Sequence, residues 1–252
     1  MNKAVQITCL AAIAAICLTN AALAQTSVTL TGPPPGYVYD GIYMSPYYAT
    51  VGGVTNTPIV CDDFGDDSNS GSTWNATVTS FSNITSTNTS WGLTAASNTK
   101  LYGAAGYLFG QILSASTPYN KVVDTFELWA LFDPGAVKNY LASTSVGAGA
   151  PISTSALSDL IFGTASNPGG LLASLLQQNF SASAYSNLII LSPDNSNGTI
   201  CAAGQGNCGA QEFITFSVPE GGTGVTYLLL AGFCCVGAMW VRLRSTRSRI
   251  IA

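Results

Sequence analysis

The spacing of hydrophobic positions along the chain changes from a two-residue period to a helical period and back. Over 74–81 apolar and polar side chains nearly alternate, which predicts a strand with one buried face. Over 101–112 and again over 122–129 the apolar residues recur every three or four positions, which predicts two helices. A continuous apolar run at 188–191 and the segment 213–218 then indicate strands again.

Shorter signals complete this order of elements. The run 59–61 predicts a short strand, and 136–143 predicts a helix after Asp133-Pro134-Gly135. Leucines from 171 to 176 predict another helix. Strands, then helices, then strands indicate an α+β fold, with an antiparallel β-sheet or barrel that carries a helical insertion. The absence of strand–helix alternation argues against a doubly wound fold.

Both ends of the chain carry apolar segments that differ from the rest. Lys3, the apolar run 7–18 and the small residues 22–24 have the layout of a signal peptide over 1–24, which implies export by the Sec translocon and cleavage by signal peptidase. The segment 223–241 contains no charged residue and is long enough to cross a bilayer as a helix. The tail 242–252 that follows carries Arg242, Arg244, Arg247 and Arg249, which are expected to stay cytoplasmic.

Between these segments lies an acidic body, 25–217, that contains no histidine. It holds eleven Asp and Glu against three Lys, so its surface is expected to repel nucleic-acid phosphates, and nucleic acid is excluded as a partner. Without histidine the chain has no Ser-His-Asp or Cys-His machinery and no imidazole metal ligand. We therefore expect one extracytoplasmic domain with no assembled catalytic group.

The residues before the apolar segment resemble a sorting motif. They are Val218, Pro219, Glu220, Gly221 and Gly222. A Pro-Glu motif, an apolar helix and a basic tail, in this order over 218–252, resemble the PEP-CTERM signal of Gram-negative bacteria. The resemblance implies recognition by exosortase, a membrane protease that removes the anchor, and a role near exopolysaccharide and biofilm. Gly221 replaces the usual second proline, and a tail anchor that is never cut is the alternative.

A second resemblance concerns the body. Cys61-Asp62-Asp63-Phe64, the strand over 74–76 and the helix end over 128–134 resemble a group of PEP-CTERM proteins of undefined activity. Their layout is weakly similar to the thioester domains of Gram-positive adhesins, in which a strand Cys is cross-linked to a helix Gln and captures nucleophiles. The position of that Gln, four residues before the Trp, is Thr125 here, and Glu127 lies elsewhere on the helix. We therefore expect the scaffold without its cross-link, with Cys61 as a buried, unpaired thiol.

The other two cysteines of the body stand close together in the sequence. Cys201 and Cys208 enclose a loop without core-forming side chains, and in an oxidising compartment we expect a disulfide between them. Closing so short a loop would stabilise the fold by roughly 2.5 kcal/mol.

An acidic run after the strand at 59–61 offers a candidate calcium site. Its carboxylates, Asp62, Asp63, Asp66 and Asp67, are hard oxygen ligands of the kind that Ca²⁺ prefers. Thr77 replaces the bidentate Glu that an EF-hand loop requires at its twelfth position. A solvated turn is the favoured interpretation, and no cofactor is expected apart from this calcium alternative.

These observations together predict a non-enzymatic surface protein. It would be anchored transiently in the inner membrane of a Gram-negative bacterium and then delivered to the outer surface or extracellular matrix, where it serves adhesion or structure in exopolysaccharide or biofilm. A calcium-dependent carbohydrate-binding module is the first alternative, and a secreted hydrolase that uses two carboxylates is the second.

Overall fold

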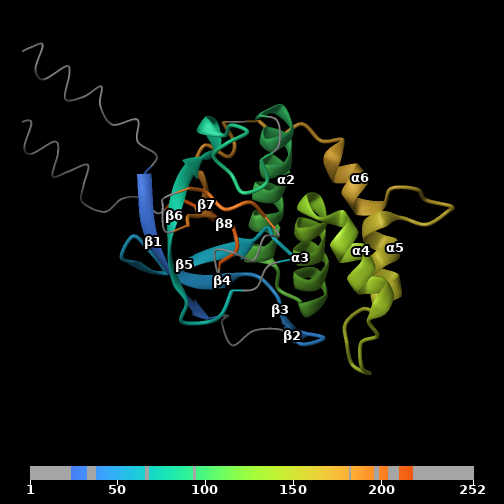
Figure 1. The fold of residues 1–252 in the computed structure, drawn as a ribbon. Coiled ribbons are helices and arrows are strands. Elements are labelled where there is room, and N and C mark those ends of the chain that lie inside the picture. Colours follow the sequence, from blue (N-terminus) through green and yellow to red (C-terminus); the bar gives the residue numbers. More distant parts are fainter. Residues whose placement is uncertain are drawn as a thin grey trace, which may run out of the picture. The chain divides into compact units, whose positions relative to one another are not determined.

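A computed structural model of the chain describes residues 24–32, 38–65, 68–92, 95–181, 183–195, 199–203 and 210–217. Six strands close into an antiparallel barrel in the order β1-β4-β5-β8-β7-β6 (Figure 1). They are β1 (Ala24–Gly32), β4 (Tyr47–Val51), β5 (Val54–Cys61), β6 (Thr73–Ser80), β7 (Leu188–Pro193) and β8 (Phe213–Phe216). A hairpin of β2 (Val38–Tyr39) and β3 (Ile42–Tyr43) forms a separate two-stranded sheet.

Helices form an insertion between β6 and β7. They are the short η1 (Phe81–Asn83), then α2 (Ala95–Ser114), α3 (Pro118–Phe132), α4 (Pro134–Ser143), α5 (Thr154–Phe162) and α6 (Gly170–Leu176). In Figure 1 the helices α2 to α6 lie on one side of the barrel, and α2 lies nearer to it than α4, α5 and α6 do. The predicted α+β fold with a helical insertion is therefore confirmed in its closed-barrel form.

Local sequence signals fix where these helices begin. Thr117 accepts a hydrogen bond from the backbone N–H of Asn120 at 3.2 Å, and Pro118 follows at the first helical position of α3. Asp133 begins α4 in the same way, accepting from Ala136 N–H at 2.9 Å. Because Asp133 also ends α3, one residue sets the turn between the two helices.

The barrel interior is a small apolar cluster. Alternation along β6 buries Trp74 and Ala76 inside it, as the spacing over 74–81 predicts. The Trp74 ring stacks on Phe213 of β8 at 5.5 Å between centroids, and Cys61 at the end of β5 belongs to the same cluster. Cys61 is therefore part of the apolar interior of the barrel.

A second, larger core lies among the helices and joins them to the barrel. Phe109 of α2 stacks on Phe216 of β8 with centroids 4.8 Å apart. Phe126 of α3 packs edge-on against Tyr39 of β2 at 5.5 Å. These contacts hold the helical insertion and the β2–β3 hairpin against the end of the barrel where β5 and β8 meet.

Several predictions need a correction or stay open. The tyrosine-rich segment before β5 forms β2, β3 and β4, and α5 forms over Thr154–Phe162; none of these elements was predicted. The signal peptide, the sorting motif and the apolar segment 223–241 lie outside the described residues. Among the helices that the structure describes, none is both long and apolar enough to span a bilayer.

Two glycines of α2 test how the insertion packs. A Cβ at Gly106 would lie 2.8 Å from the Tyr185 ring and 3.2 Å from Leu188, whereas a Cβ at Gly110 would meet nothing within 4 Å. Gly110→Ala should raise the free energy of unfolding by up to about 1 kcal/mol through helix propensity. Gly106→Ala should lower it by about 1–3 kcal/mol through overpacking. Urea denaturation of the two variants checks this contrast, and equal effects would contradict the packing described here.

Candidate functional site

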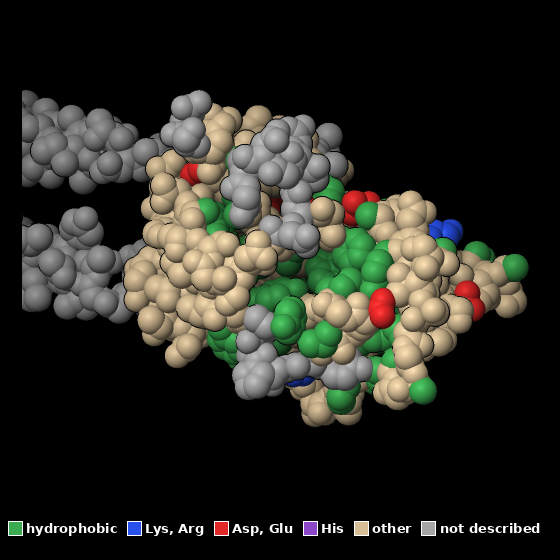
Figure 2. Space-filling model, turned by 60° about the horizontal axis from the view of Figure 1, so that its bottom comes forward, with side chains coloured by type: hydrophobic (Ala, Val, Ile, Leu, Met, Phe, Trp, Pro, Cys, Tyr) green, Lys and Arg blue, Asp and Glu red, His purple; other side chains and the backbone are tan. Residues whose placement is uncertain are grey.

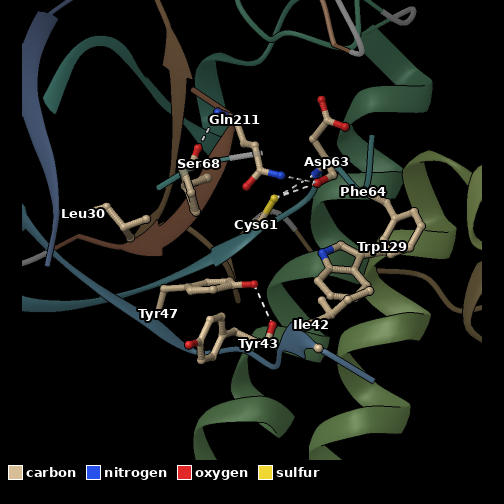
Figure 3. Close-up of a pocket in the computed structure, with 12 residues that line it drawn as sticks. Leu30, Ile42, Tyr43, Tyr47, Cys61, Asp63, Phe64, Ser68, Trp129 and Gln211 are labelled. Carbon is tan, nitrogen blue, oxygen red and sulfur yellow. Dashed lines mark hydrogen bonds between the residues drawn. The ribbon is translucent and has the colours of Figure 1, made fainter. Parts of the chain in front are cut away.

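A cavity of about 230 Å³ lies where β5, α3 and the β2–β3 hairpin come together (Figure 3). Aromatic side chains and one free thiol line it together with polar groups. The residues that matter for its chemistry are Tyr43, Tyr47, Cys61, Asp63, Trp129 and Gln211. The cavity is therefore lined by both aromatic and polar side chains, and the Cys61 sulfur lies among them.

Cys61 ends β5 with its side chain almost completely buried, at 1 % exposure. Its Sγ–H donates to the carbonyl oxygen of Asp63 at 2.9 Å, and the Asp63 N–H donates back to Sγ at 3.3 Å. Burial, and then the neighbouring carboxyl groups of Asp62 and Asp63, raise the pKa of Cys61 well above its usual value. The sulfur is therefore a neutral thiol at neutral pH.

The carboxamide of Gln211 lies against this thiol. Gln211 stands two residues before β8, and its backbone N–H donates to Ser68 Oγ at 3.0 Å. Its Nε2 donates to the carbonyl oxygen of Asp63 at 3.1 Å, which is the same oxygen that accepts the Cys61 thiol. A further hydrogen bond from the Gln211 side chain acts on Cys61 itself. Thiol and amide thus converge on one acceptor, as Figure 3 shows.

This arrangement places beside Cys61 a glutamine that the sequence did not predict there. The expected position, Thr125, is buried in α3 and does not line the cavity. The glutamine comes instead from the residues that lead into β8, because β8 pairs with β5 and Cys61 lies opposite Phe213. The prediction that Cys61 is buried and unpaired is confirmed.

Trp129 closes the cavity on the helical side. Its ring packs against Phe64 and Phe126 with centroids 5.1 Å away in both cases, which fixes its orientation. The indole is 2 % exposed, and its N–H finds no hydrogen-bond partner among the described residues. In Figure 3 the nitrogen lies on the edge of the ring that faces Cys61. A buried donor without an acceptor costs about 1–3 kcal/mol, so it is a candidate to bind an acceptor atom in the cavity.

The rim of the cavity is aromatic. Tyr43 is half exposed, and its carbonyl oxygen accepts a hydrogen bond from Tyr47 Oη at 2.7 Å. Figure 2 views the side of the molecule on which β2 and β3 lie in Figure 1, and hydrophobic side chains gather in its centre. The β2–β3 hairpin therefore contributes an exposed aromatic edge beside the thiol.

The first two acidic residues after β5, Asp62 and Asp63, are not solvated as the predicted turn would require. Asp62 and Asp63 are 0 % and 2 % exposed, and the Asp62 N–H donates to the carbonyl oxygen of Glu212, just before β8, at 3.4 Å. Asp66 and Asp67 lie outside the described residues. In the described part of the chain, no group of three or more His, Cys, Asp or Glu could hold a metal ion.

Asp62 faces a second buried acid, Glu212, away from the barrel interior. Burial, and then the nearby carboxyl groups of Glu212 and Asp63, raise the pKa of Asp62 well above its ordinary value. The hydrolase alternative needs two carboxylates that converge in one cleft, and neither member of this pair lines the cavity.

Comparison with known proteins adds no relative. No family model matches the chain, and neither a curated protein nor a solved structure matches it.

Cys208 lies outside the described residues, so its disulfide with Cys201 stays a prediction. The geometry around Cys61 is the structural observation from which a function can be inferred.

Glu127, the other acyl group near Trp129 in the sequence, is also buried, at 6 % exposure. Burial and the neighbouring Asp124 raise the pKa of Glu127 to about 7, and burial raises the pKa of Asp124 to about 6. Since both values lie above those of the unfolded chain, the folded state binds more protons between about pH 4 and pH 7. Its stability must therefore fall as the pH rises through this window.

This titration predicts a pH dependence of folding. The free energy of unfolding should fall from about pH 4 to about pH 7, by at most about 1.4 kcal/mol per pH unit for each group. Glu127→Gln should flatten the upper part of that slope. Asp159→Asn, which removes an exposed carboxylate of α5, is the matched control for the loss of one charge. Urea denaturation at several pH values measures the slope, and an unchanged slope in Glu127→Gln would contradict this origin.

Proposed function

We propose that the protein is an exported surface protein that attaches covalently to its target through a thioester between Cys61 and Gln211. One observation carries the proposal: a buried thiol and a partly buried carboxamide donate hydrogen bonds to the same carbonyl oxygen, at 2.9 and 3.1 Å. Two groups held on one acceptor are preoriented for reaction, which lowers the entropic cost of forming a bond between them. The resemblance of the Cys61 and Trp129 motifs to adhesin thioester domains agrees with this chemistry.

Formation of the cross-link balances without another reactant. Cys61 Sγ attacks Gln211 Cδ, the Cδ–Nε2 bond breaks, and the thiol proton leaves with the nitrogen as ammonia. Because burial raises the pKa of Cys61, the sulfur carries the proton that the departing nitrogen needs. The burial of the Cys61 sulfur limits the access of bulk water to the thioester from that side, which slows hydrolysis.

The unpartnered N–H of Trp129 suits the charge that this reaction develops. Attack on the amide carbon places negative charge on the former carbonyl oxygen, which a fixed donor in a buried site stabilises strongly. Trp129 lines the same cavity as both reacting residues, and two aromatic neighbours fix its ring. We assign it the role of donor to this oxygen.

The cavity favours an amine as the acceptor. A primary amine attacks the thioester carbon, forms an amide with Gln211 and returns the proton to the Cys61 sulfur. Aromatic rings at the rim and the acidic body attract an ammonium group before it loses its proton and reacts. The chain has no histidine to activate a hydroxyl group, whereas an amine needs no such help.

The two ends of the chain indicate where in the cell the protein would act. A signal peptide over 1–24 and a PEP-CTERM-like signal over 218–252 would deliver the body to the surface or matrix of a Gram-negative bacterium. An amine-bearing component of the exopolysaccharide or biofilm matrix is then the target. The protein would act once per molecule, as an adhesive and structural element rather than as an enzyme.

Intact-mass measurement of the chain recovered from cells tests the proposal. The body should weigh one ammonia less than its sequence requires, because thioester formation releases that molecule. The same spectrum reports removal of 1–24 and of the C-terminal anchor. Methylamine should add its whole mass and expose one free thiol.

Three variants separate the cross-link from unrelated mass changes. Cys61→Ala and Gln211→Ala should both have the full expected mass and should not take up methylamine. Gln178→Ala removes an exposed glutamine of the same chain and should behave as the wild type. A wild-type body of full mass with a free Cys61 would refute the thioester.

Trp129→Phe tests the donor role while it preserves most of the packing. We expect ammonia loss and methylamine uptake to slow by at least about tenfold, because the developing oxyanion loses its donor. Trp91→Phe is the matched control, since its indole N–H is equally buried and unpartnered in the described structure but does not line the cavity. Equal rates in the two variants, measured by mass spectrometry over time, would rule out this role.

A further inference from the structure

The β5–β6 connection, residues 62–72, contacts Gln211 at two separate points. The Gln211 side chain donates through Nε2 to the carbonyl oxygen of Asp63 at 3.1 Å, and the Gln211 backbone N–H donates to Ser68 Oγ at 3.0 Å. In Figure 3 the Ser68 hydroxyl meets the backbone of Gln211, and the Gln211 side chain extends from there toward Cys61. One connection therefore holds both the amide group and the backbone of this residue.

The strand ladder ends before it reaches Gln211. The last pair of the ladder between β5 and β8 contains Cys61. A single longer backbone bond follows it, from the Asp62 N–H to the carbonyl oxygen of Glu212 at 3.4 Å. One residue further out, the N–H of Gln211 donates to the side chain of Ser68. The Ser68 hydroxyl thus takes the place of a partner strand at the residue that carries the amide.

The β5–β6 connection is fixed near both of its ends. Near its start, the Asp63 side chain accepts a hydrogen bond from the Gly65 N–H at 2.8 Å. Near its far end, the Gly71 N–H donates to the Leu30 carbonyl oxygen of β1 at 2.7 Å. Ser68 stands between these two contacts in the sequence and is partly buried in the cavity wall. Both contacts limit where its hydroxyl group can lie.

We propose that Ser68 is a positioning residue for the cross-link: by accepting the Gln211 backbone N–H, it keeps the acyl carbon of Gln211 beside the Cys61 sulfur. The inference rests on the proposed thioester. The bond from Gln211 reaches Ser68 through its backbone and not through the reacting amide, so Ser68 acts through Gln211. Its contribution is needed before the cross-link exists, because afterwards the covalent bond between Sγ and Cδ holds the two residues together.

This order of events separates positioning from a direct part in the chemistry. Formation of the thioester needs the amide to lie beside the thiol, so it should slow when the Ser68 acceptor is lost. Attack of an amine on the finished thioester does not need that placement, because the covalent bond already supplies it. Loss of a reacting hydroxyl group, or a general loosening of the cavity, would change both steps.

The test measures the two steps separately in the full chain. Chain dissolved from inclusion bodies in urea is diluted into detergent at one pH, and ammonia loss is followed by intact mass over time. The rate is divided by the folded fraction from near-ultraviolet circular dichroism, and the loss seen in Cys61→Ala is subtracted. Methylamine is then added, and its uptake by the cross-linked fraction is followed in the same way. The chains compared are the wild type, Ser68→Ala, Ser68→Thr and Ser70→Ala.

The variants give distinct expectations. Ser68→Ala has no acceptor for the Gln211 N–H, so its cross-link should form at least about tenfold more slowly per folded molecule. The fraction that has formed the cross-link should take up methylamine at the wild-type rate. Ser68→Thr keeps a hydroxyl group and should restore the rate of formation. Ser70→Ala removes an exposed hydroxyl group from the same connection and should follow the wild type in both steps.

Other results would contradict a stated claim. A wild-type rate of formation in folded Ser68→Ala, no recovery in folded Ser68→Thr, or equal slowing of both steps would overturn the positioning role. If Ser68→Ala does not fold, hydrogen exchange at the Gln211 N–H in Cys61→Ala decides. Slow exchange there supports the role, because no cross-link is present, and exchange as fast as in the unfolded chain overturns it.

The proposed thioester fails in a different way. A wild-type chain that folds but never loses ammonia would refute the thioester itself, and the role of Ser68 with it. A wild-type chain that loses ammonia at the same rate per folded molecule as Ser68→Ala would refute the role of Ser68 alone.

Discussion

The pairing of β5 with β8 is the contact on which both the barrel and the site depend. Strand β5 precedes the whole helical insertion in the sequence, and β8 follows it. Their antiparallel pairing therefore joins strands from both sides of the insertion and closes the barrel. The same contact brings the end of β5, with Cys61, to the residues that lead into β8, with Gln211. The strand pairing that closes the barrel therefore also brings together the residues of the cavity.

Burial then determines what the assembled groups can do. A thiol in water would be partly ionised and open to oxidation, whereas Cys61 is covered and its pKa is raised. Covering two acids nearby costs free energy unless they are neutral or well bonded. Glu212 receives three donors, and burial raises the pKa of Asp62, which favours its neutral form, so both conditions are met without a positive charge.

The fold could be predicted from periodicity because its long elements obey simple spacing. The helical repeat of 101–112 and the near-alternation of 74–81 correspond to α2 and β6. The tyrosine-rich β2, β3 and β4 gave no clear period, because tyrosine packs with its ring while its hydroxyl group reaches polar partners. Helix α5 has only nine residues, which is too short for a stripe to stand out.

The site was harder to predict because its two halves meet only through long-range strand pairing. Cys61 stood out as an odd cysteine in a motif, but nothing local marks Gln211 among the glutamines of the body. The resemblance directed attention to the helix before Trp129, where Thr125 stands. One signal was available: Gln211 lies two residues before the last predicted strand, 213–218, and a closed sheet needs that strand as a partner. The acids were misjudged for a related reason, because a run of carboxylates predicts a solvated turn only while each is charged, and Asp62 is buried as the neutral acid.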